Sequence, residues 1–157
     1  MTRAIERKRF DDEGNELIRG DIVMAYFPNL DSDLDEEQLK EFESVLKHFS
    51  DYNMENIKKP SSVQKGIRPA VVVQNDKGNI HSPVIQLSPI TSRSKKSLPT
   101  HVPVENLNGT GLIKKSTILV EQTQLIDKHF IFGKIGKLNH HLIPNLNRAV
   151  AIEYGIG

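Results

Sequence analysis

Hydrophobic positions along the chain fall into short runs separated by glycine, proline, asparagine and charged residues, which is typical of a protein built mainly from β-strands. The first run, residues 21–27 (DIVMAYF), combines β-branched, aromatic and apolar side chains and ends at Pro28. Residues 69–75 (PAVVVQN) predict a buried strand, and the glycine-containing residues 76–79 (DKGN) predict a turn after it.

Four further strands are predicted in the second half of the chain. They cover residues 82–90 (SPVIQLSPI), 100–104 (THVPV), 116–126 (STILVEQTQLI) and 132–138 (FGKIGKL). Apolar residues at positions 142, 146 and 150 then recur at the spacing of a C-terminal helix, whose start Pro144 leaves open. Short strands with one terminal helix predict a small, strongly bent sheet or barrel of the mainly β (α+β) class.

A different pattern separates the first two strands. Leu39, Phe42 and Phe49 recur at helical spacing, and the acidic residues at positions 35–37 suit the positive end of a helix dipole. We therefore expect an inserted acidic helix between these strands. Residues 31–59 contain nine acidic and four basic residues, whereas residues 61–157 contain twelve basic and five acidic ones. The second group predicts a basic surface, which suits a polyanionic partner.

Composition predicts one globular domain in the cytoplasm. A length of 157 residues, with 37% hydrophobic and 26% charged residues, suits one folded domain over 1–157, with an N-terminal extension at 1–18 and an inserted loop at 30–62. The chain lacks cysteine, which excludes disulfides and thiolate metal sites. No stretch approaches the roughly 18 apolar residues of a membrane span, so no membrane partner is expected.

Neither a metal nor a cofactor is expected from the sequence. The six histidines show no metal-ligand spacing, and neither of the glycine-rich motifs that cradle phosphates of nucleotides is present. No nucleophile-elbow motif supports a serine hydrolase. The chemistry must therefore come from side chains that the fold brings together.

Two polar residues stand at strand ends. Arg68 directly precedes the strand 69–75, and Thr91 directly follows the strand 82–90. If these strands are antiparallel neighbours, a guanidinium and a hydroxyl meet at one end of the sheet and can bind phosphate oxygens. The loop that follows carries donors able to track a nucleic-acid backbone, namely Ser92, Arg93, Lys95 and Lys96. The alternative is an exposed arginine near a turn-forming threonine.

Six segments resemble, in order, the MazF/PemK family, the ribonuclease toxins of bacterial toxin–antitoxin pairs. They read RGDIVMAYF, VQKGIRPAVVVQND, SPVIQLSPITSR, LPTHVPVE, GLIKKSTILVEQTQLIDK and GKIGKL. The resemblance implies an SH3-like β-barrel that acts as a homodimer. It also implies a metal-independent endoribonuclease (an mRNA interferase) that cuts single-stranded RNA within a short sequence and is neutralised by an antitoxin. The family's catalytic arginine and threonine fall on Arg68 and Thr91.

Base recognition has three candidates in the family-like segments: Gln64, Glu121 and Gln122. They are equally compatible with polar positions at strand edges. The chain departs from the family in the long insertion between residues 28 and 66, and in Gln124, where the family often has arginine. The acidic insertion is either a solvated helix or an acidic segment that occupies the basic RNA groove. Deleting residues 31–59 tests the second reading, which predicts faster RNA cleavage without antitoxin.

Two other functions compete with the nuclease. The gyrase-inhibiting CcdB toxins resemble this fold and end in an aromatic-Gly-Ile sequence, and this chain ends EYGIG. The other competitor is a barrel that binds RNA without cutting it. Arg68 and Thr91, within their family-like segments, favour the nuclease.

Overall fold

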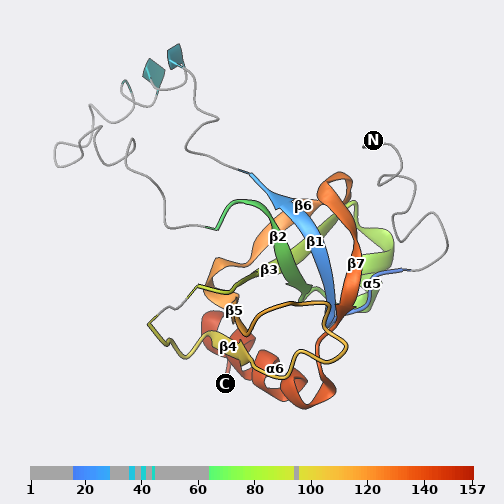
Figure 1. Ribbon diagram of the computed structural model, residues 1–157. Helices are drawn as coiled ribbons and strands as arrows, with labels where there is room; N and C mark the ends of the chain where they lie inside the picture. Colours follow the sequence, from blue (N-terminus) through green and yellow to red (C-terminus); the bar gives the residue numbers. More distant parts are fainter. Residues whose placement is uncertain (1–15, 29–35, 38–39, 42–43, 45–63, 94–95) are drawn as a thin grey trace. The chain divides into compact units, whose positions relative to one another are not determined.

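The structure is a computed structural model that describes residues 16–28, 36–37, 40–41, 44, 64–93 and 96–157 (Figure 1). The chain divides into two compact units, one formed by Met1–Phe27 with Ile67–Gly157 and the other by Pro28–Gly66. In the second unit, residues 36–37, 40–41 and 44 are helical. The rest of the predicted acidic helix, and most of the predicted N-terminal extension, lie outside the described residues.

Seven strands form one sheet in the order β4-β5-β3-β2-β1-β7, with β6 paired to β3. The pairs with a described register are antiparallel. The strands are β1 (Asp21–Phe27), β2 (Gly66–Val72), β3 (Val84–Thr91), β4 (His101–Val104), β5 (Ser116–Leu119), β6 (Gln124–Asp127) and β7 (Ile131–Lys137). The mainly β class is therefore confirmed. The described pairs leave the sheet open, so they do not confirm a closed SH3-like barrel.

The run predicted as one strand over residues 116–126 is two strands, β5 and β6, separated by the 3-10 turn η2 (Val120–Gln122). Thr123 explains the break. Its hydroxyl donates a 2.7 Å hydrogen bond to the Val120 carbonyl and lies 2.7 Å from the Ser88 hydroxyl on β3. Such a local side-chain-to-backbone bond competes with the strand ladder. As a result, β3 pairs with β6 near its start and with β5 at its end.

Residues 76–79 are not the turn that the sequence predicts. They begin the short helix α5 (Asp76–His81), because Asn75 caps its first turn by accepting a 2.9 Å hydrogen bond from the Gly78 amide. The prediction of a C-terminal helix is confirmed. After the 3-10 turns η3 (Lys128–Phe130) and η4 (His140–Leu142), helix α6 spans Ile143–Glu153 with a proline in its first turn, where no backbone donor is needed.

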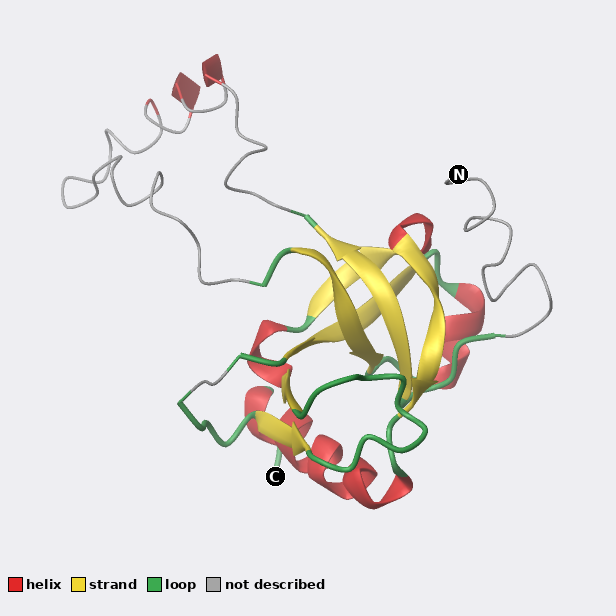
Figure 2. Cartoon of the chain, viewed as in Figure 1, coloured by secondary structure: helices red, strands yellow, loops and turns green. Residues whose placement is uncertain are grey.

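Hydrophobic side chains fill both faces of the central strands. Val72 packs with residues of β1, β3, β6 and β7 in one cluster, whereas its neighbour Val71 packs in another with Ile118 of β5 and Leu146 of α6. Adjacent strand residues point to opposite faces, so two buried faces require a continuous apolar run. Helix α6 covers the second cluster below β4 and β5 (Figure 2). No helix in the described part of the chain has the length and apolar character needed to cross a membrane.

Candidate active site

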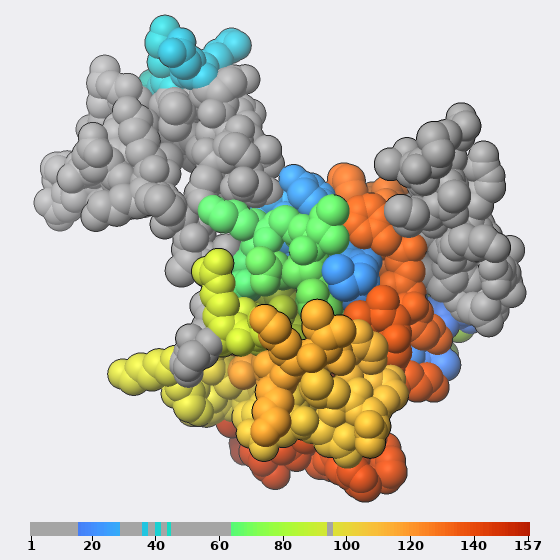
Figure 3. All heavy atoms as spheres, in the orientation of Figure 1, coloured from blue at the N-terminus to red at the C-terminus, as the bar shows by residue number. Residues whose placement is uncertain are grey.

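An open pocket of about 370 Å³ lies where β2 begins and β3 ends. In Figure 3 the green residues of β2, the yellow-green residues that end β3 and the gold residues that precede β5 meet around it. The lining residues come from three segments and are Ile67, Arg68, Pro69, Ile90, Thr91, Ser92, Arg93, Leu112, Ile113, Lys114 and Ser116. The two strand-end residues singled out in the sequence therefore line one pocket.

The pairing of β2 with β3 explains why the pocket opens here. Its register joins Val72 to Leu87, Val71 to Ser88 and Ala70 to Pro89. The same register, continued by two residues, places Arg68 opposite Thr91. Pairing stops before that point because prolines 69 and 89 have no amide hydrogen to donate, and the end of β3 pairs instead with β5 on its other side. The strands thus leave the ladder with Arg68 and Thr91 on either side of the opening.

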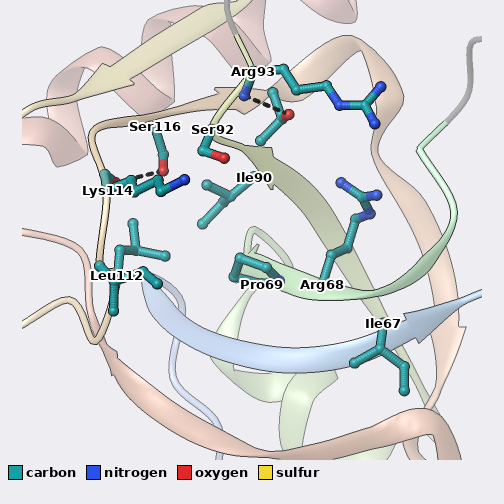
Figure 4. A pocket seen from close by; sticks show the side chains of 11 residues that line it. Ile67, Arg68, Pro69, Ile90, Ser92, Arg93, Leu112, Lys114 and Ser116 are labelled. Atoms are coloured by element: carbon teal, nitrogen blue, oxygen red, sulfur yellow. Dashed lines mark hydrogen bonds between the residues drawn. The ribbon is translucent and has the colours of Figure 1, made fainter.

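Thr91 presents its hydroxyl from a largely buried position, with 4% of the residue exposed. Its Oγ1 accepts a 3.2 Å hydrogen bond from the Arg93 amide (Figure 4). That bond turns the chain after β3 and keeps the hydroxyl hydrogen available as a donor. Thr91 is therefore held by its own neighbour in a fixed orientation at the pocket wall.

Arg68 is half-buried and shares the pocket with a second guanidinium. Figure 4 shows the Arg68 and Arg93 side chains pointing to the same side of the opening. Burial, and secondarily the positive charge of Arg93, lower the pKa of Arg68 from its ordinary value. An arginine remains charged at neutral pH despite such a shift. An anion placed between the two guanidinium groups would relieve their repulsion, so this part of the pocket suits a phosphate.

Lys114 adds a third cation from the opposite wall, in the loop before β5 (Figure 4). The Ser116 hydroxyl donates a 2.8 Å hydrogen bond to the Lys114 carbonyl and shapes this loop. Further back, Gly111 has a φ of +77° and lies so close to β7 that a Cβ there would overlap the Ile135 carbonyl oxygen. The loop is thus pressed against the sheet, and the position of Lys114 depends on that glycine.

Residues 18–153 match the family of PemK-like, MazF-like toxins of type II toxin–antitoxin systems. The chain belongs to this family. Endoribonuclease MazF of Staphylococcus saprophyticus is 40% identical to it over 96 residues, which are 60% of this chain and 79% of that protein. The family expected from the sequence is therefore confirmed.

Solved structures of similar fold agree with this assignment. The toxin MazF-mt6 of Mycobacterium tuberculosis superposes with a TM-score of 0.54 at 25% identity, over 60% of this chain and 93% of its own. An endoribonuclease from a mycobacterial species, solved with its cognate antitoxin, gives a TM-score of 0.58 over 90% of this chain and 97% of its own. At 15% identity, the second comparison bears on the fold alone.

The remaining binding candidates of this toxin fall into two groups. Ser92 and Arg93 line the pocket with the candidate catalytic pair. Lys96 is exposed and is not a lining residue, and Lys95 lies outside the described residues. Gln64 is buried before β2 and is not among the lining residues either. The cationic loop that the sequence proposed therefore contributes its first residues to the pocket.

Glu121 is occupied elsewhere in the fold. Its carboxylate accepts a 2.9 Å hydrogen bond from the Thr100 hydroxyl and lies 3.0 Å from Nε2 of His101, which begins β4. His101 in turn accepts a 3.3 Å hydrogen bond at Nδ1 from the Leu98 amide. Glu121 and its neighbour Gln122 are not lining residues of the pocket. This network holds the start of β4 against η2.

Lys114 is a charged lining residue of the pocket that the sequence reasoning did not select. It stands in the family-like segment GLIKKSTILVEQ, two residues before the predicted strand 116–126. A basic residue at a strand entrance was the available signal. Among the described residues, no three histidine, aspartate or glutamate side chains are grouped so that they could hold a metal ion.

Proposed function

We propose that the toxin is an endoribonuclease that cuts single-stranded RNA, with Arg68 and Thr91 as its catalytic residues. One observation carries the proposal: a guanidinium near the start of β2 and a hydroxyl at the end of the antiparallel neighbour β3 line one cationic pocket. The curated relative of 40% identity is named an endoribonuclease, which is the enzyme class predicted from the sequence. The proposal extends that activity to this chain.

The proposed reaction uses the RNA's own 2′-hydroxyl as nucleophile and is metal-independent. The 2′-oxygen bonds to phosphorus, the bond from phosphorus to the 5′-oxygen breaks, and the proton lost at the 2′-oxygen is balanced by one gained at the leaving 5′-oxygen. The products are a 2′,3′-cyclic phosphate and a 5′-hydroxyl. Negative charge gathers on the non-bridging oxygens in the transition state. Arg68 stabilises it, and Thr91 donates a hydrogen bond to the same phosphoryl group or orients the nucleophile.

The cationic side chains around Arg68 and Thr91 are proposed to bind the RNA backbone. Arg93 lines the pocket beside Arg68, and Lys114 faces them. Ser92 adds a hydroxyl, and lysines 95 and 96 continue the basic loop. Cleavage at a short sequence requires base contacts as well, for which Gln64, Glu121 and Gln122 remain predictions.

An antitoxin and a second copy of the chain complete the proposed assembly. A structural neighbour was solved with its cognate antitoxin, and MazE-MazF complexes of Deinococcus radiodurans share the fold. We extend this partner to the present toxin. The homodimer, the closed SH3-like barrel, the cytoplasmic location and the single domain over 1–157 remain predictions from the family resemblance and composition.

The test is cleavage of a long mixed-sequence RNA in EDTA by the wild type, by Arg68→Ala and by the control Arg148→Ala. Arg148 is an exposed arginine on α6 that does not line the pocket. The proposal predicts discrete cuts by the wild type and the control, and their loss in Arg68→Ala. Intact RNA with inhibited DNA supercoiling would support a gyrase poison. Intact RNA that is merely retained would support a binding module.

A further inference from the structure

A second pocket of about 200 Å³ adjoins the first and shares four lining residues with it: Thr91, Ser92, Arg93 and Ser116. Its remaining lining residues come from the end of β4 and the start of β5. The shared residues form a polar ridge between the two hollows. An RNA strand with a phosphate in the first pocket can therefore continue directly into the second pocket.

The floor of this second pocket is a row of side chains across three strands. Thr91 of β3 pairs with Thr117 of β5, and Thr117 pairs with Pro103 of β4. Residues paired in this way point to the same face of a sheet, so two hydroxyls and one apolar ring lie side by side. The row starts at the candidate catalytic threonine, and it ends in an exposed proline ring.

A second group of lining residues, each two positions from a residue of the first row and just outside the strands, is charged. It contains Arg93, Lys115 and Glu105, which also line the pocket. The register of β4 with β5, continued by one residue, places Glu105 opposite Lys115. Even so, the Glu105 carboxylate has no hydrogen-bond or ion-pair partner among the described residues. It is the one carboxylate among the described residues that line either pocket.

We propose that this second pocket is the subsite for a nucleotide next to the scissile phosphate, and that Glu105 accepts hydrogen bonds from the amino group of its base. A carboxylate repels the phosphates that Arg93 and Lys115 attract, so it suits a donor on the base edge. Adenine, cytosine and guanine each present an exocyclic amino group. Uracil presents one N–H between two carbonyl oxygens, which the carboxylate would repel. The subsite thus discriminates against uracil.

This inference rests on the proposed function for its substrate class, and it moves base reading to a residue that the sequence did not suggest. The three earlier candidates for base recognition do not line this pocket. Glu105 does, in the charged group beside the floor that begins at Thr91. Proteins read unstacked RNA bases by hydrogen bonds to their Watson–Crick edges. An exocyclic amino group on that edge can donate a hydrogen bond to the Glu105 carboxylate.

The deciding experiment measures binding of 2′-O-methyl oligonucleotides, which have no nucleophilic hydroxyl and cannot be cut. We expect the wild type to bind oligo(A) and oligo(C) about tenfold more tightly than oligo(U), the scale of one hydrogen bond to a charged group. Glu105→Gln, whose amide can both donate and accept, is expected to bring oligo(U) within about twofold of the others. Glu153→Gln on α6 makes the same charge change outside both pockets and should keep the preference.

Mapping of cut ends on a mixed RNA separates this inference from the proposed function. Uracil should be depleted at one position beside the wild-type cuts and restored there by Glu105→Gln. Wild-type cleavage with no such depletion, or equal binding of the three oligonucleotides, would overturn the subsite and leave the nuclease standing. If Glu105→Gln tightened the binding of oligo(A), oligo(C) and oligo(U) equally, the subsite would also be overturned. The loss of one negative charge near the RNA would then explain the whole effect. Selective binding without cleavage would refute the nuclease alone, and no binding at all would refute the subsite.

Discussion

Arg68, at the start of β2, and Thr91, at the end of β3, line one pocket from opposite sides of a strand pair that has just separated. The pair needs no long-range loop to form, because the antiparallel register of β2 and β3 brings the two positions together. Prolines 69 and 89 end the ladder and leave space for a ligand between the two strands. Binding chemistry and an opening to receive the ligand thus arise from the same few residues.

Arg68→Lys should lose activity almost as fully as Arg68→Ala does. A lysine keeps the charge but replaces a planar, bidentate donor with a point charge on a flexible stem. Loss of a preorganised donor costs about 10²–10³-fold in rate, and we expect Arg68→Lys to fall at the lower end of this range. Single-turnover cleavage measures the effect, with thermal unfolding as the folding control. Wild-type rates in the lysine variant would show that charge alone suffices.

Thr91 should tolerate serine and not valine. Serine retains the hydroxyl that accepts the Arg93 amide hydrogen bond, whereas valine has nearly the same shape without it. We expect Thr91→Val to slow cleavage by about 10²-fold and Thr91→Ser to lose much less. Comparison of kcat with KM for the two variants distinguishes a donor to the phosphoryl group from a packing role. Equal loss in both variants would contradict the assignment.

Arg93→Ala should weaken RNA binding uniformly across sequences. Arg93 lines both pockets, and its guanidinium is assigned to backbone phosphates, which carry no sequence information. The slope of log affinity against log salt concentration should fall by about one. Salt titrations with oligo(A), oligo(C) and oligo(U) test this. A change confined to one of these oligonucleotides would reassign Arg93 to base recognition.

Gly111→Ala should destabilise the protein more than Gly109→Ala. Both glycines have a φ of +77°, but a Cβ at Gly111 would overlap the Ile135 carbonyl oxygen, whereas a Cβ at Gly109 meets nothing within 4 Å. The shared backbone conformation costs roughly 1–2 kcal/mol for alanine. Overlap with the backbone adds about 1–3 kcal/mol for Gly111→Ala alone. Urea unfolding measures the free energy of unfolding of both variants. Equal losses would contradict the close approach of Gly111 to the Ile135 carbonyl oxygen.

Local sequence patterns were sufficient for most strands, which are short apolar runs between turn residues, and for the C-terminal helix, which has a helical apolar period. They were insufficient where a single polar side chain redirects the backbone. Asn75 caps α5 where a glycine-containing turn was expected, and Thr123 divides residues 116–126 into two strands. Both bonds join residues three apart, and the apolar pattern alone does not show which local hydrogen-bond arrangement the backbone adopts. The contact of Thr123 with Ser88 on β3 is long-range, and a one-dimensional pattern does not contain it.

The candidate catalytic pair was accessible from the sequence because it required only two strand ends and one assumption, that the strands are antiparallel neighbours. Finding Lys114 and Glu105 required knowledge of the strand order as well. They reach the pockets through the pairing of β5 with both β3 and β4, and the order of strands in a sheet is a long-range property. Residue types and spacing thus determined the local elements and the charges available. The tertiary register alone decided which charges share a pocket, because it brings together residues far apart along the chain.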